Sequence, residues 1–192
     1  TAFADMKLGW SFLIETDQTI SSAISLNIAG TAAGPITLYA ASEHVTITQS
    51  ANAAHFTIGS TSTRLIFSKL KFANSNGTKT SAYALDLANS GSTLCNQCVF
   101  DSTLLNSAKR TANNPRIKMV DCDINSPSGD GLECSGSSGP IVVIGCRFFE
   151  CGGIGISQGA AALYIQDTIV YSCTGDGIKT ATGHIEPVII RN

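Results

Sequence analysis

The residues best suited to acid–base chemistry are two aspartates, Asp121 and Asp123, which flank Cys122. In an extended segment both carboxylates lie on one face of the strand, and their Cβ atoms are about 6.5 to 7 Å apart. Inverting glycoside hydrolysis uses two carboxyl groups roughly 6.5 to 9.5 Å apart with a water between them. Asp121 and Asp123 are therefore the candidate catalytic acid and base. An exposed cross-strand ion pair accounts for the same Asp-x-Asp pattern equally well.

Other charged residues are candidates for binding. The repeat described below places Arg147 one coil beyond Asp123, where it can pair with that carboxylate or bind a carboxylate of a substrate. Glu133 and Lys179 fall in a second column of charged residues, together with Asp86. We expect Arg147, Glu133 and Lys179 to be binding residues.

The sequence does not predict a metal site or a cofactor. Asp130 and Asp176 lie in two Gly-Asp-Gly turns, where their side chains can accept hydrogen bonds from local backbone N–H groups. Calcium would need several converging oxygen ligands, and the sequence does not establish such convergence. His44, His55 and His184 are far apart in repeat register, which favours histidines on the surface or in turns.

The elements that must position these residues belong to an internal repeat. Segments 68–72, 96–100, 120–124, 144–148 and 166–170 align, and their central residues are 28, 24, 24 and 22 positions apart. Spacing in this range indicates a solenoid in which each repeat is one coil, so equivalent inward residues stack about 4.8 Å apart. The predicted ladder consists of Leu70, Cys98, Cys122, Cys146 and Thr168.

Two further series support several short strands per coil. Glycine turns at 129–132, 152–154 and 175–178 recur at intervals of 22 and 24 residues. Pro35, Pro115, Pro140 and Pro187 each precede a β-branched run, which suits the first position of a strand. The runs are rich in Val, Ile, Thr and Phe. We therefore predict an all-β fold, a right-handed single-stranded parallel β-helix with about 22–24 residues per coil.

The boundaries follow from the repeat. Residues 1–23 are expected to form a lead-in or a first partial coil, and residues 24–192 the β-helix. Segment 101–114 is expected to be a long excursion between strands, with a helical turn as one option. The sequence ends in a strand register without a polar cap, so we expect a fragment of a longer solenoid or an end covered by a partner.

These repeats resemble the pectate-lyase-like superfamily of right-handed β-helix proteins, particularly extracellular and phage-borne members with degenerate coils. The resemblance covers roughly residues 24–192, and segment 30–38 looks like the phrase that often opens such repeats. Several members hydrolyse polysaccharides with acidic residues on an outer strand face, which is what the resemblance implies for Asp121 and Asp123. Pectate lyases use clustered acidic calcium ligands and an arginine base, and no arginine lies in a matching motif here.

Composition argues against several classes of partner. Charged residues make up 14% of the chain, the net charge is −2, and there is no Lys/Arg cluster, so no nucleic acid is expected as a partner. No apolar run reaches the roughly 18 residues needed to cross a bilayer, so no membrane span is expected. Seven cysteines are too few for a disulfide scaffold, and we interpret those in the ladder as small buried apolar residues.

The function expected from these features is a structural or glycan-binding section of an extracellular or virion surface protein, such as a phage tail fibre or tailspike. The alternatives are a polysaccharide-degrading hydrolase or lyase and a bacterial surface adhesin. The expected partner is a polysaccharide or cell-surface glycan, and a homotrimer is the expected assembly of a phage shaft. Tyr39, Tyr83, Phe149 and Tyr171 are suited either to stacking on sugar rings or to internal packing.

Overall fold

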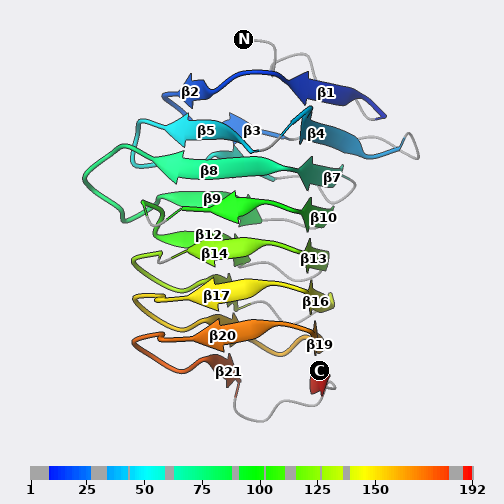
Figure 1. The fold of residues 1–192 in the computed structure, drawn as a ribbon, viewed down its shortest axis with the longest axis vertical. Coiled ribbons are helices and arrows are strands. Elements are labelled where there is room, and N and C mark those ends of the chain that lie inside the picture. The colour runs from blue at the N-terminus through cyan, green and yellow to red at the C-terminus, as the bar shows by residue number, and fades with distance from the viewer. Residues whose placement is uncertain are drawn as a thin grey trace.

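The computed structural model describes residues 9–26, 34–42, 44–58, 63–87, 91–101, 103–110, 116–125, 127–135, 139–181 and 188–191. Within these ranges every regular element is a β-strand, and the coils stack from the N-terminus at the top of Figure 1 to the C-terminus at the bottom. No helix that is long and apolar enough to cross a membrane is found in this part of the chain. The predicted right-handed parallel β-helix is confirmed.

The strands form three parallel sheets, to which each coil contributes one strand apiece (Figure 1). Sheet A contains β1 (Ser11–Ile14), β4 (Ile36–Ala40), β7 (Thr63–Ser68), β10 (Gly91–Asn96), β13 (Arg116–Val120), β16 (Ile141–Ile144), β19 (Leu163–Gln166) and β22 (Val188–Arg191). Sheet B contains β2 (Gln18–Ile20), β5 (Val45–Gln49), β8 (Leu70–Asn74), β11 (Val99–Phe100), β14 (Asp123–Asn125), β17 (Arg147–Phe149) and β20 (Ile169–Tyr171). Sheet C contains β3 (Ile24–Ser25), β6 (Phe56–Thr57), β9 (Tyr83–Leu87), β12 (Asn106–Arg110), β15 (Leu132–Cys134), β18 (Ile156–Gln158) and β21 (Ile178–Thr180).

The strand register confirms the predicted ladder. In sheet B, Val99 pairs with Lys71 and with Asp123, and Asp123 pairs with Arg147, so the residues that precede them stack in the predicted order. Because the side chains of a strand alternate between its two faces, every second residue enters the interior. The strand β5 shows this alternation of buried and half-buried residues along its whole length.

The interior is filled differently along the solenoid. Near β6 to β11 it contains a cluster of phenylalanine rings, in which Phe72 lies 5.8 Å from Phe67 and 5.3 Å from Phe100 between ring centroids. Further along it contains buried cysteines, among them Cys122 and Cys146. Both regions are fully shielded from solvent, so the hydrophobic effect acts on each of them.

One corner column, at the position just before or at the start of the sheet C strands from β6 to β21, contains three different residue types in its first three coils and glycine in the next three. The register of β6, β9, β12, β15, β18 and β21 places its members above one another. They are His55, Ala84, Ser107, Gly131, Gly155 and Gly177. A Cβ atom at Gly131 would lie 2.6 Å from a ring carbon of Phe148, so this coil has no room for a side chain there.

The register of the glycine turns differs from the prediction. Leu132 pairs with Ile156 rather than with Ile154, and Ile156 pairs with Ile178, so the intervals are 24 and 22 residues. The prediction aligned Gly152-Gly-Ile154 with the other two turns because the three segments have similar residue types. The glycine that takes the corner position in that coil is Gly155.

Segment 101–114 is not a plain excursion, because its described part contains one turn, closed by the Leu104 N–H to the carbonyl of Asp101 at 3.1 Å, and then a strand. Residues 106–110 form β12, the sheet C strand of this coil. The segment Asn-Ser-Ala-Lys-Arg contains no β-branched or aromatic residue, so the composition gave no strand signal. Register with β9 and β15 imposes the strand.

The predictions about proline positions, the opening phrase and the boundary at residue 24 are tested only where the residues are described. Pro35 and Pro140 directly precede β4 and β16, as expected for the first position of a strand. Pro115, Pro187, His184 and residues 30–33 of the opening phrase lie outside the described residues. The division at residue 24 stays a prediction, and β1 and β2 already pair with β4 and β5 in sheets A and B.

Candidate functional site

In the five coils from β7 to β20, the corner between sheets A and B is made by one left-handed residue. These residues have φ between 49° and 64°, and they are Lys69, Gln97, Asp121, Gly145 and Asp167. A residue with a side chain costs roughly 1 kcal/mol in this region of backbone space, so the stacked coils must stabilise it. Each backbone N–H in the column donates to a carbonyl of the following coil, for example from Asp121 to Ile144 at 2.9 Å.

The ladder behind this corner is a hydrogen-bonded column as well as an apolar one. Cys122 and Cys146 each donate a thiol hydrogen bond of 3.3 Å to the carbonyl two residues earlier, and Thr168 does the same with its hydroxyl at 2.9 Å. The backbone N–H of Cys122 points at the sulfur of Cys146 at 3.4 Å, and that of Cys146 points at the Thr168 hydroxyl at 3.3 Å. Small side chains with a γ donor suit both tasks.

Cys134 and Cys151 are not set up as nucleophiles. Burial raises the pKa of the Cys134 thiol to about 12, and burial together with the neighbouring Cys173 raises that of Cys151 to about 12. Because the thiolate is the reactive form, these two thiols stay protonated and inert at neutral pH. The interpretation of the cysteines as structural residues agrees with this environment.

Asp121 and Asp123 do not lie on one strand, so the geometric basis of their pairing was wrong. Asp121 is the left-handed corner residue that follows β13, with φ of 50°, whereas Asp123 begins β14. The prediction treated Val120 to Ile124 as one continuous strand, in which the spacing would follow from strand rise. A one-residue corner interrupts it, because a left-handed residue turns the chain from sheet A into sheet B.

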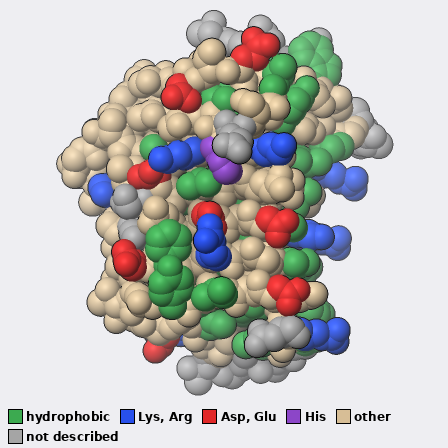
Figure 2. Space-filling model, viewed as in Figure 1, with side chains coloured by type: hydrophobic (Ala, Val, Ile, Leu, Met, Phe, Trp, Pro, Cys, Tyr) green, Lys and Arg blue, Asp and Glu red, His purple; other side chains and the backbone are tan. Residues whose placement is uncertain are grey.

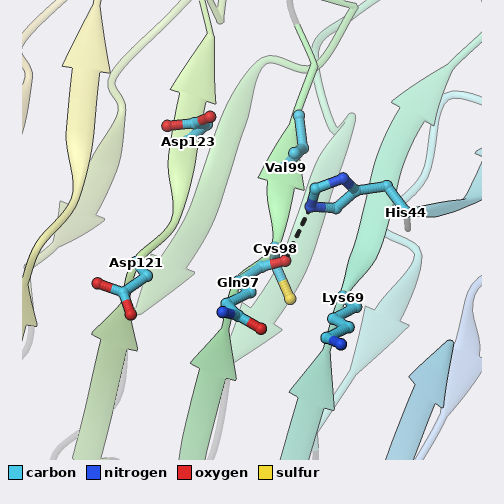
Figure 3. A pocket seen from close by; sticks show the side chains of 7 residues that line it. All are labelled: His44, Lys69, Gln97, Cys98, Val99, Asp121 and Asp123. Carbon is cyan, nitrogen blue, oxygen red and sulfur yellow. Dashed lines mark hydrogen bonds between the residues drawn. The ribbon is translucent and has the colours of Figure 1, made fainter. Parts of the chain in front are cut away.

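Asp121 and Asp123 nevertheless line one groove, which we call the corner groove. It has a volume of about 490 Å³ and is lined by His44, Lys69, Gln97, Cys98, Val99, Asp121 and Asp123. Figure 3 shows the two carboxylates on one side and His44 and Lys69 on the other. The His44 ring donates from Nε2 to the carbonyl of Gln97 at 3.0 Å, since a carbonyl only accepts.

Arg147 lies one coil beyond Asp123, and the predicted ion pair between them is confirmed. Arg147 donates from Nε and Nη2 to the two carboxylate oxygens of Asp123, at 2.7 and 2.5 Å. The hydrogen bonds to Asp123 and its negative charge raise the pKa of Arg147. Both oxygens of Asp123 are therefore occupied by one planar, charged donor.

Phe149 and Tyr171 form an aromatic platform beside this ion pair. Their rings stack with centroids 5.7 Å apart and an interplanar angle of 10°. Tyr171 is 47% exposed, and its neighbour Ile169 is also exposed on the outer face of sheet B. Figure 2 shows hydrophobic side chains gathered next to the adjacent red and blue pair on this face. The four side chains Arg147, Phe149, Ile169 and Tyr171 belong to β17 and β20, which pair directly.

Glu133 and Lys179 are not neighbours. Lys109 lies between Asp86 and Glu133 in the outer column of sheet C, and Ser157 separates Glu133 from Lys179. Glu133 accepts a hydrogen bond from the Asn106 amide at 2.7 Å and pairs with Lys109 at 3.6 Å. Lys109 was not among the predicted binding residues because segment 101–114 was expected to be an excursion between strands.

Asp130 is a turn residue, but its hydrogen bond spans coils. Its carboxylate accepts from the backbone N–H of Ile154 at 2.8 Å, and its own N–H donates to the Asn106 side chain at 2.9 Å. The expected bond to a local N–H is therefore replaced by one to the next coil. Among the described residues no group of three or more His, Cys, Asp and Glu is placed to hold a metal ion.

His55 is buried rather than on the surface. Its Nε2 lies 3.0 Å from the carbonyl of Ile47 and 2.8 Å from that of Ala73, and its Nδ1 lies 3.2 Å from that of Tyr83. Burial lowers the pKa of His55, and the three carbonyl contacts oppose this shift only in part. His55 is thus a neutral structural histidine at neutral pH.

Comparison with known protein families agrees with the fold. Residues 56–192, more than half of the chain, match the family model described as "Right handed beta helix region". This match is consistent with the resemblance to pectate-lyase-like proteins. No curated protein and no solved structure gives a match.

Proposed function

Because this chain belongs to the family of right-handed β-helix regions, we propose that it is a section of an extracellular or virion surface protein, such as a phage tail fibre or tailspike. This section binds glycans and is non-catalytic. β-helix regions of this kind are found in surface proteins and in polysaccharide-active enzymes. The choice between these two classes therefore depends on the outer surface. The observation that carries the proposal is the aromatic platform of Phe149 and Tyr171 beside Arg147.

The platform has the chemistry that sugar recognition needs. The C–H face of a sugar ring packs on an exposed aromatic face, and nearby donors orient its hydroxyl or carboxylate groups. Arg147 binds Asp123 through Nε and Nη2, which leaves Nη1 without a partner among the described residues. Nη1 is thus available to a ligand that lies on Tyr171.

The platform is also rigid. Phe149 and Tyr171 lie on the paired strands β17 and β20, at the β20 edge of sheet B, so parallel pairing sets the spacing of the two rings before any ligand binds. A surface that needs no ordering loses less free energy on binding. This favours recognition of an extended chain by a flat surface.

The carboxylates support binding more than catalysis. Glycoside hydrolysis needs one carboxyl group to give a proton and a second to activate water or attack the sugar. Asp123 accepts hydrogen bonds from Arg147 on both of its oxygens, and Asp121 projects from the corner before it. A carboxylate held in this way is poorly suited to either role.

The test is a glycan array followed by titration with the best-bound glycan. The double variant Phe149→Ala/Tyr171→Ala should weaken binding by about tenfold or more, since stacking on an aromatic face is worth about 1 kcal/mol per ring. Tyr39→Ala, which truncates a tyrosine on the outer face of sheet A, should bind as the wild type does. If the wild type retains no glycan, or if the double variant binds equally well, the proposal is wrong.

A polysaccharide hydrolase or lyase is the second candidate, and the corner groove is the observation that favours it. The groove brings Asp121 and Asp123 together with His44 and Lys69. The protein should be incubated with acidic and neutral polysaccharides while reducing ends and the absorbance of unsaturated uronates are followed. Product that disappears in Asp121→Asn would establish this candidate in place of the non-catalytic one.

Assembly is a separate part of the proposal. Phage shafts resembling this fold are generally trimers, and secreted lyases are generally monomers. Light scattering of the protein should therefore give the mass of three chains for a shaft. A monomer would favour the enzyme.

A further inference from the structure

The outer surface of sheet A differs in charge from the other two sheets. Its described strands contain no Asp or Glu, and their charged residues are all cations: Arg64, Arg116, Lys118 and Arg191. The chain as a whole has a net charge of −2, so this excess of positive charge is local. In Figure 2 Lys and Arg side chains project from the right edge, where the strands of sheet A stand in Figure 1.

The cations of sheet A also differ from those of sheets B and C in their pairing. On sheets B and C, Lys71 pairs with Asp101 at 2.8 Å and Lys109 with Glu133 at 3.6 Å. Arg64, Arg116 and Lys118 are exposed, and within the described residues none of them has an acidic partner at ion-pair distance. Their charge is therefore available to a ligand.

The three cations surround a groove with an apolar floor. The groove has a volume of about 400 Å³, and its lining includes Arg64, Arg116 and Lys118 together with half-buried Ile66, Leu94 and Val142. Ser92 pairs with Arg64 on one side and Arg116 on the other, so the two arginines lie two coils, or about 9.6 Å, apart along the solenoid. Lys118 lies two residues beyond Arg116 on β13.

We propose that this groove on sheet A binds a linear anionic polysaccharide, which runs along the solenoid axis across β7, β10, β13 and β16. The cations pair with carboxylate or sulfate groups at intervals of one or two sugars, and the apolar floor of Ile66, Leu94 and Val142 packs against the C–H faces of the rings. This site lies on a different sheet from the aromatic platform. It goes beyond the proposed function and does not depend on it.

Other occupants fit the charges and the shape less well. A second copy that used the same face would oppose cation to cation, because the described strands of sheet A offer no acid in return. A lipid surface is flat, whereas this site is hollowed. Duplex nucleic acid is bound through many more phosphate contacts than three side chains supply.

The test uses one polymer in three charge states: dextran, carboxymethyl dextran and dextran sulfate. Binding to immobilised polymer should require charge, and it should weaken as NaCl is added, because exposed charges are screened. A preference for the carboxymethyl or the sulfate form identifies the anion. Retention of neutral dextran to the same extent would overturn the proposal.

The triple variant Arg64→Gln/Arg116→Gln/Lys118→Gln should raise the dissociation constant for the preferred anionic dextran by about tenfold or more. A matched variant, Lys71→Gln/Lys79→Gln/Lys109→Gln, removes the same charge outside sheet A and should bind within about twofold of the wild type. Circular dichroism verifies that both variants keep the β-fold. Equal losses in the two variants would show a non-specific charge effect and would refute the site.

Two further outcomes would also refute it. Tighter binding of the wild type to phosphatidylserine vesicles or to duplex DNA than to either anionic dextran would assign the groove to another class of partner. A change of mass in light scattering for the sheet A variant alone would assign it to contact between copies. Phe149→Ala/Tyr171→Ala should keep its affinity for anionic dextran, so failure of this site and failure of the platform can be told apart.

Discussion

Two coils of the corner column before sheet C fill the same position in opposite ways. Toward one end of the column the imidazole of His55 enters the interior and packs edge-on against Phe72, with centroids 5.5 Å apart. Toward the other end, where the members are glycines, Gly131 leaves no side chain, and the ring of Phe148 occupies the space. The register of the strands is continuous through both coils. The backbone of a solenoid therefore fixes where residues stack, and the volume of each coil can be divided differently among them.

The largest loss of stability is expected from truncation of the phenylalanine that packs at each of these two positions. Phe72 contacts Phe67, Phe100 and the His55 ring, so Phe72→Ala should lower the free energy of unfolding by about 5 kcal/mol. Phe148→Ala should cost about 3 kcal/mol, the lower part of the range for a buried phenylalanine. Urea denaturation of both variants measures the difference. A cost for Phe148→Ala equal to or above that for Phe72→Ala would contradict the comparison.

A smaller loss of stability is expected when a side chain is added at Gly131. In Gly131→Ala the new Cβ would meet the ring of Phe148 and the backbone carbonyl of Gly155, so we expect a loss of roughly 3 kcal/mol from overpacking. Ala84→Gly is the reverse change in the same column and should cost only about 1 kcal/mol. Thermal unfolding of the pair tests this. Similar losses for both would mean that the column is not tighter at its glycine end.

The smallest effect on stability is expected from the protonation of His55. Because burial lowers the pKa of His55 in the folded protein, the unfolded chain takes up its proton at higher pH than the folded chain does. Stability should be greatest above the ordinary histidine pKa of about 6.5 and should fall as the pH drops below it. His55→Gln should flatten the profile between about pH 7 and 5.5. An unchanged slope in urea titrations across this interval would show that His55 does not contribute.

The ladder could be predicted from the sequence because one residue per coil recurs at a nearly constant spacing. Leu70, Cys98, Cys122 and Cys146 are visible as a series before any coordinate is known, and the ion pair of Asp123 with Arg147 follows from the same register. Periodicity is a property of the chain, so it can be seen without knowledge of the packing.

Features set by backbone turns or by packing between coils could not be predicted in this way. Nothing in the residue type of Asp121 distinguishes a left-handed corner from a strand position, because aspartate occurs in both. The burial of His55 depends on three carbonyls from other segments. Lys109 was missed because β12 is held by its neighbours and has little strand propensity of its own.

The left-handed column between sheets A and B has a consequence for design. Within this one chain the column holds Lys69, Gln97, Asp121, Gly145 and Asp167, four different residue types in one backbone conformation. The neighbouring coils fix that conformation through the N–H bonds, so residue identity at the column is free to change while the turn persists. The column therefore provides a row of substitutable positions about 4.8 Å apart, at which chosen side chains can be displayed in a line without redesign of the scaffold.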